Sequence, residues 1–148
     1  MSEGITGFRH AGISVQNMDA SLAFYVRLLG LTMISDRVSP DGGRFVGAAD
    51  AAVRICLLEI PGSAAHIELL EYRGAGGSPV TAKPVDFGSG HASFWVKDID
   101  RLFERLEAAN VPVLTPPIEP SSGRKKFYAC DPDGFWLELT EAPVREST

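Results

Sequence analysis

Two histidines and two glutamates occupy matching places in the two halves of this sequence. His10 and His91 each begin a segment that reads His-Ala-x-apolar-x-Val. Glu68 and Glu138 each stand in a later segment that reads apolar-Glu-Leu-x-Glu. The recurrence of both segments indicates an internal duplication. Imidazole and carboxylate groups together are ligands for Zn, Ni, Co, Mn or Fe(II), so these four residues form a candidate metal site.

Strand alternation places the four side chains on one face of the expected sheet. Successive side chains of a strand point to opposite faces. In the strand that begins at His10, the apolar residues at 11, 13 and 15 are expected to pack under a helix, so the imidazole faces the other way. The same rule directs five other side chains that could bind a metal ion or a substrate away from the helices: Glu68, His91, Glu138, Trp95 and Trp136.

The spacing of apolar residues predicts one amphipathic helix in each half, over 18–29 and over 99–109. Asn17 and Asp98 are the expected N-caps, because their side-chain oxygens can accept hydrogen bonds from the free amides of the first turn. Strands are expected at 10–15, 32–37, 53–58, 66–72, 91–96, 113–114, 125–130 and 136–140.

These elements organise the chain into two modules of one domain, over 7–73 and 91–141, with a Pro/Gly-rich linker at 74–90. Each module is a βαβββ unit whose four strands and single helix cannot close alone. The predicted fold class is therefore α+β, with two βαβββ modules forming a cupped, mostly antiparallel sheet and the helices on its convex face. Glu71 falls on the packing side near a strand end, where we expect it to be solvated.

Composition narrows the classes of partner. The 148 residues include 14 Lys and Arg against 19 Asp and Glu, which gives a net charge of −5. An acidic chain of this kind argues against nucleic acid as the main partner. No apolar run approaches the roughly 18 residues that a membrane span requires. Cys56 and Cys130 form no disulfide framework, so we expect a reducing compartment, by default the cytoplasm.

These features together resemble the vicinal oxygen chelate superfamily, which includes glyoxalase I, methylmalonyl-CoA epimerase, extradiol dioxygenases, fosfomycin-resistance enzymes and bleomycin-binding proteins. The resemblance covers residues 7 to 141. The segments that carry it are 8–15, 23–25, 29–31, 67–71, 90–96, 128–134 and 137–139. It implies paired βαβββ modules around one divalent metal ion, with the ligand positions carried over onto His10, Glu68, His91 and Glu138. Proteins of this resemblance are often dimers, so a homodimer is expected.

Occupancy of the four positions favours the glyoxalase I and epimerase branch, in which all four are commonly filled. Lewis-acid polarisation of a chelated carbonyl would assist proton abstraction from the neighbouring carbon. Glu68 and Glu138 are the candidate catalytic bases. Two bases on opposite faces would give epimerisation, whereas one base shuttling the proton would give isomerisation. The sequence does not choose between these two outcomes.

Two other classes of function remain open. An Fe(II) extradiol-type dioxygenase would use His10, His91 and Glu138 and would tolerate loss of Glu68. A metal-free protein of the same fold would bind or sequester a small aromatic molecule.

Substrate-binding candidates come from two features. The Gly-containing basic segment 121–126 includes Arg124 and Lys125, which could hold a phosphate or carboxylate of a small-molecule substrate. Trp95 and Trp136 alternate onto the face of the metal candidates and could wall an apolar pocket.

Overall fold

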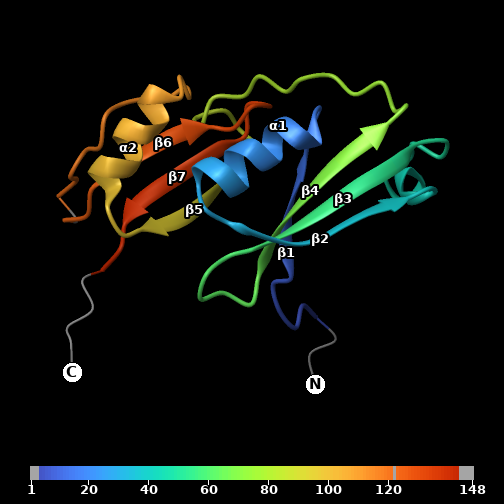
Figure 1. Cartoon of the computed structure of the whole chain (residues 1–148), viewed down its shortest axis with the longest axis horizontal. Coiled ribbons are helices and arrows are strands. Elements are labelled where there is room, and N and C mark those ends of the chain that lie inside the picture. The colour runs from blue at the N-terminus through green and yellow to red at the C-terminus, as the bar shows by residue number, and fades with distance from the viewer. Residues whose placement is uncertain (1–3, 122, 144–148) are drawn as a thin grey trace. The chain divides into compact units, whose positions relative to one another are not determined.

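The computed structural model describes residues 4–121 and 123–143 (Figure 1). The chain divides into two compact units, Met1–Ser78 and Pro79–Thr148. Along the described stretches, no helix has the length and apolar character needed to cross a membrane. Both cysteines are free.

The first unit is a four-stranded sheet with one helical connection. Its elements are β1 (His10–Ser14), α1 (Met18–Leu22), the π-helix η1 (Ala23–Leu28), β2 (Thr32–Ser39), the 3-10 helix η2 (Gly42–Val46), β3 (Ala52–Glu59) and β4 (His66–Arg73). The strands lie in the order β1-β4-β3-β2, with β1 parallel to β4 and the other pairs antiparallel. This is the predicted βαβββ order.

The second unit repeats this plan with one strand fewer. Its elements are β5 (His91–Val96), α2 (Ile99–Ala108), β6 (Lys126–Cys130) and β7 (Trp136–Glu141). The strands lie in the order β5-β7-β6, with β5 parallel to β7 and β6 antiparallel to it. The predicted α+β fold class is confirmed.

In place of the strand predicted at 113–114, the structure has only an isolated bridge between Val113 and Ala129. Proline brackets this segment at Pro112 and Pro116. Proline has no backbone N–H to donate to a sheet, so a longer strand cannot form at that place. That strand prediction was therefore wrong.

Helical capping follows the sequence, but the first helix does not stay α-helical. The Asn17 side chain accepts from the amide of Ala20 at 3.0 Å, and Asp98 accepts from Arg101 at 3.0 Å, as predicted. From Ala23 the helix widens to a π-helix rather than continuing as the predicted α-helix. This wider turn accompanies burial of the consecutive Phe24 and Tyr25, whose rings meet edge to face at 5.0 Å.

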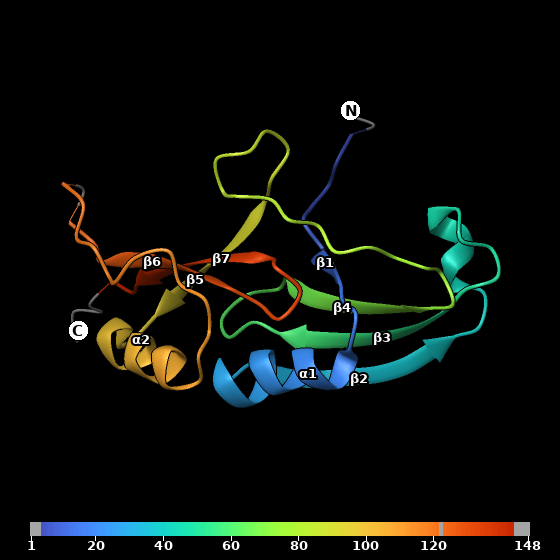
Figure 2. The ribbon, with the colours of Figure 1, turned by 90° about the horizontal axis from the view of Figure 1, so that it is seen from above.

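Each unit buries one face of its sheet against its helix, where α1 contacts β4 and α2 contacts β7 (Figure 2). Ile67 and Leu69 of β4 are buried, and so are Leu137 and Leu139 of β7. The residues that alternate with them point the other way, so Glu68 and Glu138 lie on the faces that these helices leave uncovered. The predicted alternation is therefore confirmed.

Strand β2 is an edge of the first sheet, and all its residues except Ser39 are exposed. Its pairing with β3 slips between Met33 and Ser35, which marks a β-bulge. Further along, Asp36 of β2 receives two hydrogen bonds from Arg54 of β3, at 3.1 and 2.8 Å. The same guanidinium donates to Asp19 of α1 at 3.0 Å, so one arginine connects the helix to two strands.

Glu71 is only partly exposed, so the expectation that it is solvated was wrong. One carboxylate oxygen accepts from the backbone amide of Met18 at 2.9 Å, and the other accepts from Nε of Arg73 at 2.9 Å. Burial alone would raise the pKa of Glu71, but the Met18 amide and the Arg73 guanidinium hold it below its ordinary value. Glu71 thus caps the first helix from a distant strand.

The variant Glu71→Gln is expected to lower the free energy of unfolding by about 1 kcal/mol at pH 7, because the charged cap is lost. A carboxyl whose folded pKa is lowered stabilises the protein above its unfolded pKa of about 4.3. That contribution disappears as the pH falls through the folded pKa. Urea unfolding at pH 7 and pH 3 should therefore show a difference from wild type that shrinks at pH 3. Glu59→Gln, at the exposed end of β3, is the control, and a difference that persists at pH 3 would contradict this interpretation.

Candidate functional site

The first unit brings one histidine and one glutamate together on its uncovered face. Nε2 of His10 lies 3.5 Å from Oε1 of Glu68, and these side chains are 26% and 14% exposed. The parallel pairing of β1 with β4 produces this approach, because it sets Gly12 opposite Glu68. His10 precedes Gly12 by two residues and therefore shares its face.

The His10 ring has few polar partners in its surroundings. Among the described residues, its buried Nδ1 atom has no hydrogen-bond partner. The 3.5 Å separation from Glu68 also exceeds the usual 2.7–3.2 Å of an N–H···O hydrogen bond. A partly buried imidazole with an unpartnered nitrogen, beside a carboxylate, suits a cation that both groups could coordinate. The residues of the first unit therefore fit a divalent metal ion.

The second unit places a histidine and a glutamate at the equivalent positions of its register. Parallel pairing sets Ser93 of β5 opposite Glu138 of β7, just as Gly12 stands opposite Glu68. His91 precedes Ser93 by two residues, so it stands where His10 stands in the first unit. Unlike His10, it is exposed, and its ring meets the ring of Tyr128 edge to face with the centroids 5.4 Å apart.

Three hydroxyl groups surround the Glu138 carboxylate. Tyr128 donates to Oε2 at 2.5 Å, and Ser93 and Thr140 donate to Oε1 at 3.0 and 3.3 Å. The ammonium group of Lys126 lies 3.9 Å from the same Oε1. We call Ser93, Tyr128 and Thr140 the hydroxyl collar.

The hydrogen bond from Tyr128 is the largest influence on the pKa of Glu138 and lowers it. Burial acts in the opposite direction, while Ser93 and Lys126 also lower the pKa of Glu138. Burial, together with the hydrogen bond to Glu138, raises the pKa of Tyr128 to about 12. At neutral pH the phenol is therefore a donor and the carboxylate is ionised, the state in which a carboxylate binds metal.

Each unit thus supplies one His/Glu pair. Within residues 4–121 and 123–143, the structure shows no group of three or more His, Cys, Asp or Glu side chains suited to a metal ion. That the two pairs share one metal ion stays a prediction.

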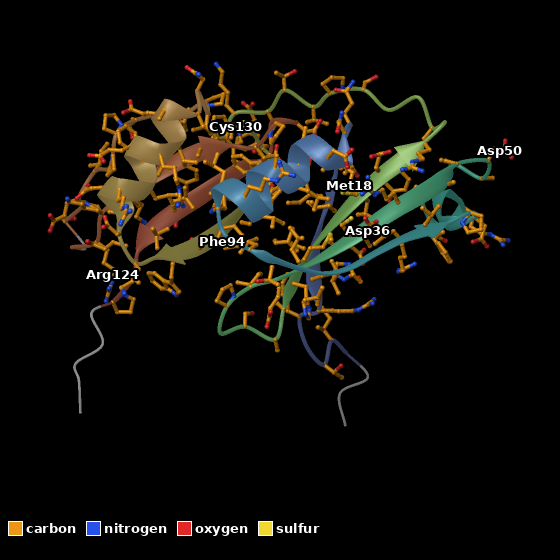
Figure 3. The ribbon with its side chains drawn as sticks, in the orientation of Figure 1. Met18, Asp36, Asp50, Phe94, Arg124 and Cys130 are labelled. Carbon is orange, nitrogen blue, oxygen red and sulfur yellow. The ribbon has the colours of Figure 1, made fainter. Side chains whose placement is uncertain are left out.

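The four substrate-binding candidates all lie in the second unit, in different surroundings. Trp95 is 66% exposed, and the Arg124 guanidinium lies 5.8 Å from the centre of its ring. Figure 3 shows Arg124 and Cys130 at opposite ends of this unit. Lys125 instead forms an ion pair of 2.7 Å with Asp100 of α2. Ser122, in the same basic segment, lies outside the described residues.

Trp136 is half-buried, and its indole N–H donates to the carbonyl of Ala82 at 2.7 Å. The indole N–H is the one polar group of this side chain, and it is already bonded within the protein. The ring still lies on the same face of the sheet as Glu138. The two tryptophans therefore have different surroundings, and Trp95 is the more accessible.

Sequence reasoning did not assign the hydroxyl collar. Tyr128 and Phe127 are adjacent aromatic residues with opposite surroundings. Phe127 is buried and meets Phe103 edge to face at 5.4 Å, whereas Tyr128 faces Glu138. Alternation along β6 indicates that Phe127 and Tyr128 face opposite ways. To place Tyr128 beside Glu138 also requires the register of β6 against β7, which sets these two residues opposite each other.

Comparison with known proteins agrees with this architecture. The family model of the Glyoxalase/Bleomycin resistance protein/Dioxygenase superfamily matches residues 7–139. The chain belongs to this superfamily. Membership confirms the family resemblance stated from the sequence, and proteins of the superfamily commonly bind a divalent metal ion.

Solved structures of the superfamily share the fold at low sequence identity. A glyoxalase family protein from Bacillus cereus has a TM-score of 0.85 at 20% identity, covering 95% of this chain and 97% of its own. The trypanothione-dependent glyoxalase I of Leishmania major has a TM-score of 0.67 at 24% identity, covering 93% of this chain and 87% of its own. Lactoylglutathione lyase from Agrobacterium tumefaciens has a TM-score of 0.60 at 18% identity, covering 98% and 100%. No curated protein matches the sequence.

Substitution of the two tryptophans should have different effects on the free energy of unfolding. Trp136→Phe removes the donor to Ala82 and is expected to lower the free energy of unfolding by about 1–2 kcal/mol. Trp95→Phe should change it by less than about 0.5 kcal/mol, because that side chain is mostly exposed. Urea denaturation of both variants and wild type tests this. Equal losses would contradict the structural role given to Trp136.

Proposed function

We propose that this protein is a divalent-metal-dependent lyase/isomerase or epimerase of the glyoxalase-like type. The metal ligands would be His10, Glu68, His91 and Glu138. The observation that carries the proposal is the matched placement of a His/Glu pair in each unit, at the same register of a parallel strand pair. The unsatisfied imidazole of His10 and the ionised carboxylate of Glu138 support it.

A bound divalent ion would polarise a substrate carbonyl and stabilise the negative charge that develops on its oxygen. The chain itself must supply the base that removes the proton from the neighbouring carbon. Glu68 and Glu138 are the carboxylates of the proposed site and are therefore the candidates for this role. Either one base transfers the proton between adjacent carbons, or two bases act on opposite faces.

The substrate class that fits this chemistry is a small molecule with neighbouring oxygens beside an acidic C–H bond. Thiohemiacetals of α-ketoaldehydes have this character, and so do acyl thioesters that carry a second carbonyl or carboxyl oxygen near the thioester. We propose that Trp95, Trp136, Arg124 and Lys125 contribute to binding its remainder. Trp95 and Arg124 are the better placed of these, because Lys125 is paired with Asp100 and the Trp136 N–H is bonded to Ala82.

We further propose that the protein acts in the cytoplasm as a homodimer. The two free cysteines suit a reducing compartment. Closed two-fold dimers are the commonest assembly of soluble oligomers.

The metal content of protein purified without added metal or chelator should be close to one equivalent of Ni, Co, Zn or Mn per chain. Glu68→Ala and His91→Ala should each lose most of it, because the proposed site needs ligands from both units. Elemental mass spectrometry measures this. Glu104→Gln, on the exposed face of α2, is the matched control and should keep its metal.

Other results of this measurement have defined meanings. Iron retained in Glu68→Ala, with oxygen consumption on a catechol, would favour the Fe(II) dioxygenase. No metal in any variant, even after reconstitution, would leave a metal-free binding protein.

Proton exchange offers a second test. In D₂O, a hemithioacetal formed from an α-ketoaldehyde and a thiol should lose the proton next to its carbonyl in the presence of the metal-loaded protein. An acyl thioester with an acidic α-proton is the alternative probe. Glu138→Gln should lower the exchange rate by about 10²–10⁴-fold, through loss of a metal ligand or of a base. ¹H NMR follows the reaction, and full exchange in Glu138→Gln would rule out its role.

A further inference from the structure

The uncovered face of the second unit continues beyond Glu138 to an exposed tryptophan. Trp95 follows Ser93 by two residues on β5, and Ser93 donates to Glu138, so the indole lies on the same face as that carboxylate. Across the sheet, Trp95 stands opposite Thr140, which also donates to Glu138. Tryptophan side chains are mostly buried in folded proteins, but Trp95 is mostly exposed. Its ring is therefore open to a ligand.

Lys126, at the start of β6, shares this face. It stands opposite Thr140 on the other side of β7, and its ammonium nitrogen lies 3.9 Å from Oε1 of Glu138. This separation is near the limit of about 4 Å for an ion pair. The hydroxyl collar already supplies Glu138 with three hydrogen bonds. The Lys126 ammonium group, which has three donors, can therefore bind an incoming anion.

Alternation separates the two cations that precede Lys126 in the chain. The Nζ atom of Lys125 turns to the helix side, where it lies 2.7 Å from Oδ2 of Asp100 in α2. Arg124 turns the opposite way, and its guanidinium carbon lies 5.8 Å from the centre of the Trp95 ring. That distance is within the range of about 6 Å over which a cation is attracted to an aromatic face. We call Trp95, Arg124 and Lys126 the cationic platform.

The acidic side chains near this segment act on Lys125. The hydrogen bond to Asp100 raises the pKa of Lys125 above its ordinary value, and the charges of Glu141 and Glu119 act in the same direction. Over residues 4–121 and 123–143, by contrast, no carboxylate forms an ion pair with Arg124. The cationic platform thus keeps an excess of positive charge in a chain whose net charge is −5.

The three side chains of the cationic platform complement an aromatic anion. A guanidinium forms paired hydrogen bonds with phosphate or carboxylate oxygens, and an ammonium group adds a point charge. An exposed indole offers a flat surface on which another aromatic ring can stack. A ligand that has only a charge or only a ring would use part of the platform.

We propose that the cationic platform binds a planar aromatic or heteroaromatic ring that carries an anionic group, and that this ring is the part of the substrate remote from the reacting carbon. The ring would stack on Trp95, and the anionic group would accept hydrogen bonds from Arg124 and Lys126. Lys126 thereby takes the role that the sequence suggested for Lys125. The assignment of this ligand to the reaction rests on the proposed function, whereas the binding itself uses residues of the second unit alone and requires no metal ion.

¹H–¹⁵N NMR spectra of the metal-free protein test the platform directly, because the chain has two tryptophans and therefore two indole N–H signals. Trp95→Phe assigns them. Titration with 1-naphthyl phosphate should shift the Trp95 signal much more than the Trp136 signal, because the Trp136 N–H is bonded to Ala82. 1-Naphthol and inorganic phosphate should each bind at least about tenfold more weakly, since each lacks one of the two recognised groups.

Substitutions should separate the contributions of charge and ring. Arg124→Gln and Lys126→Gln should each weaken 1-naphthyl phosphate binding about tenfold and leave 1-naphthol binding unchanged. Trp95→Leu should weaken 1-naphthyl phosphate binding about tenfold, through lost stacking, and leave inorganic phosphate binding unchanged. The backbone amide signal of Lys126 reports binding in that variant. Arg105→Gln, which removes one positive charge from the exposed face of α2, is the matched control and should bind as wild type does.

Two results would overturn the assignment of the platform: a Trp95 signal that does not move at millimolar 1-naphthyl phosphate, or 1-naphthol that binds as tightly as its phosphate. A loss in Lys125→Gln equal to that in Lys126→Gln would also overturn it, because general positive charge would then attract the anion.

Metal content judges the proposed function separately. Protein that contains its metal but does not bind 1-naphthyl phosphate would retain the proposed function without the platform. Protein that takes up no metal even after reconstitution, yet binds 1-naphthyl phosphate at Trp95, would retain the platform as a binding site without the proposed function.

Discussion

The parallel pairing between the first and last strands of each unit determines where every candidate ligand stands. In the first unit this register sets Glu68 opposite Gly12, two residues beyond His10, and in the second it sets Glu138 opposite Ser93. A slip of one residue would send the whole set of side chains into the apolar layer under the helix. The buried apolar residues that alternate with the glutamates in β4 and β7 therefore keep the candidate ligands in place, because they make such a slip costly.

Duplication of this scaffold has produced two halves with the same frame and different local chemistry. The first half surrounds its glutamate with glycine and leucine, and the second surrounds its glutamate with hydroxyls. The backbone register is shared, so the difference comes from the side chains that surround each glutamate. A symmetric fold can in this way give two residues of the same type different surroundings.

The sequence predicted the features that depend on local periodicity. Alternation identified the uncovered face of β4 and β7, and the caps Asn17 and Asp98 were visible as residue types.

What the sequence analysis missed depends on partners distant in the chain. Nothing near Glu71 in sequence shows that its carboxylate meets the amide of Met18, because this contact needs β4 and the start of α1 to be neighbours. Likewise, Tyr128 reaches Glu138 only because of the register of β6 against β7. Lys125 forms an ion pair with Asp100 of α2, which lies 25 residues earlier in the chain. The strand at 113–114 failed because the neighbouring prolines withhold backbone donors, a local signal that outweighed its apolar residues.

The edge strand β2 has a consequence for how copies of this chain can associate. An open edge offers unpaired backbone groups to any other strand, which invites uncontrolled joining of sheets. Here the bulge after Met33 interrupts the regular ladder, and Asp36 and Arg37 place charges beside it. Both devices obstruct the addition of a foreign strand. Sheet extension through β2 is thereby disfavoured, which would leave the chain resistant to fibrous aggregation along this edge.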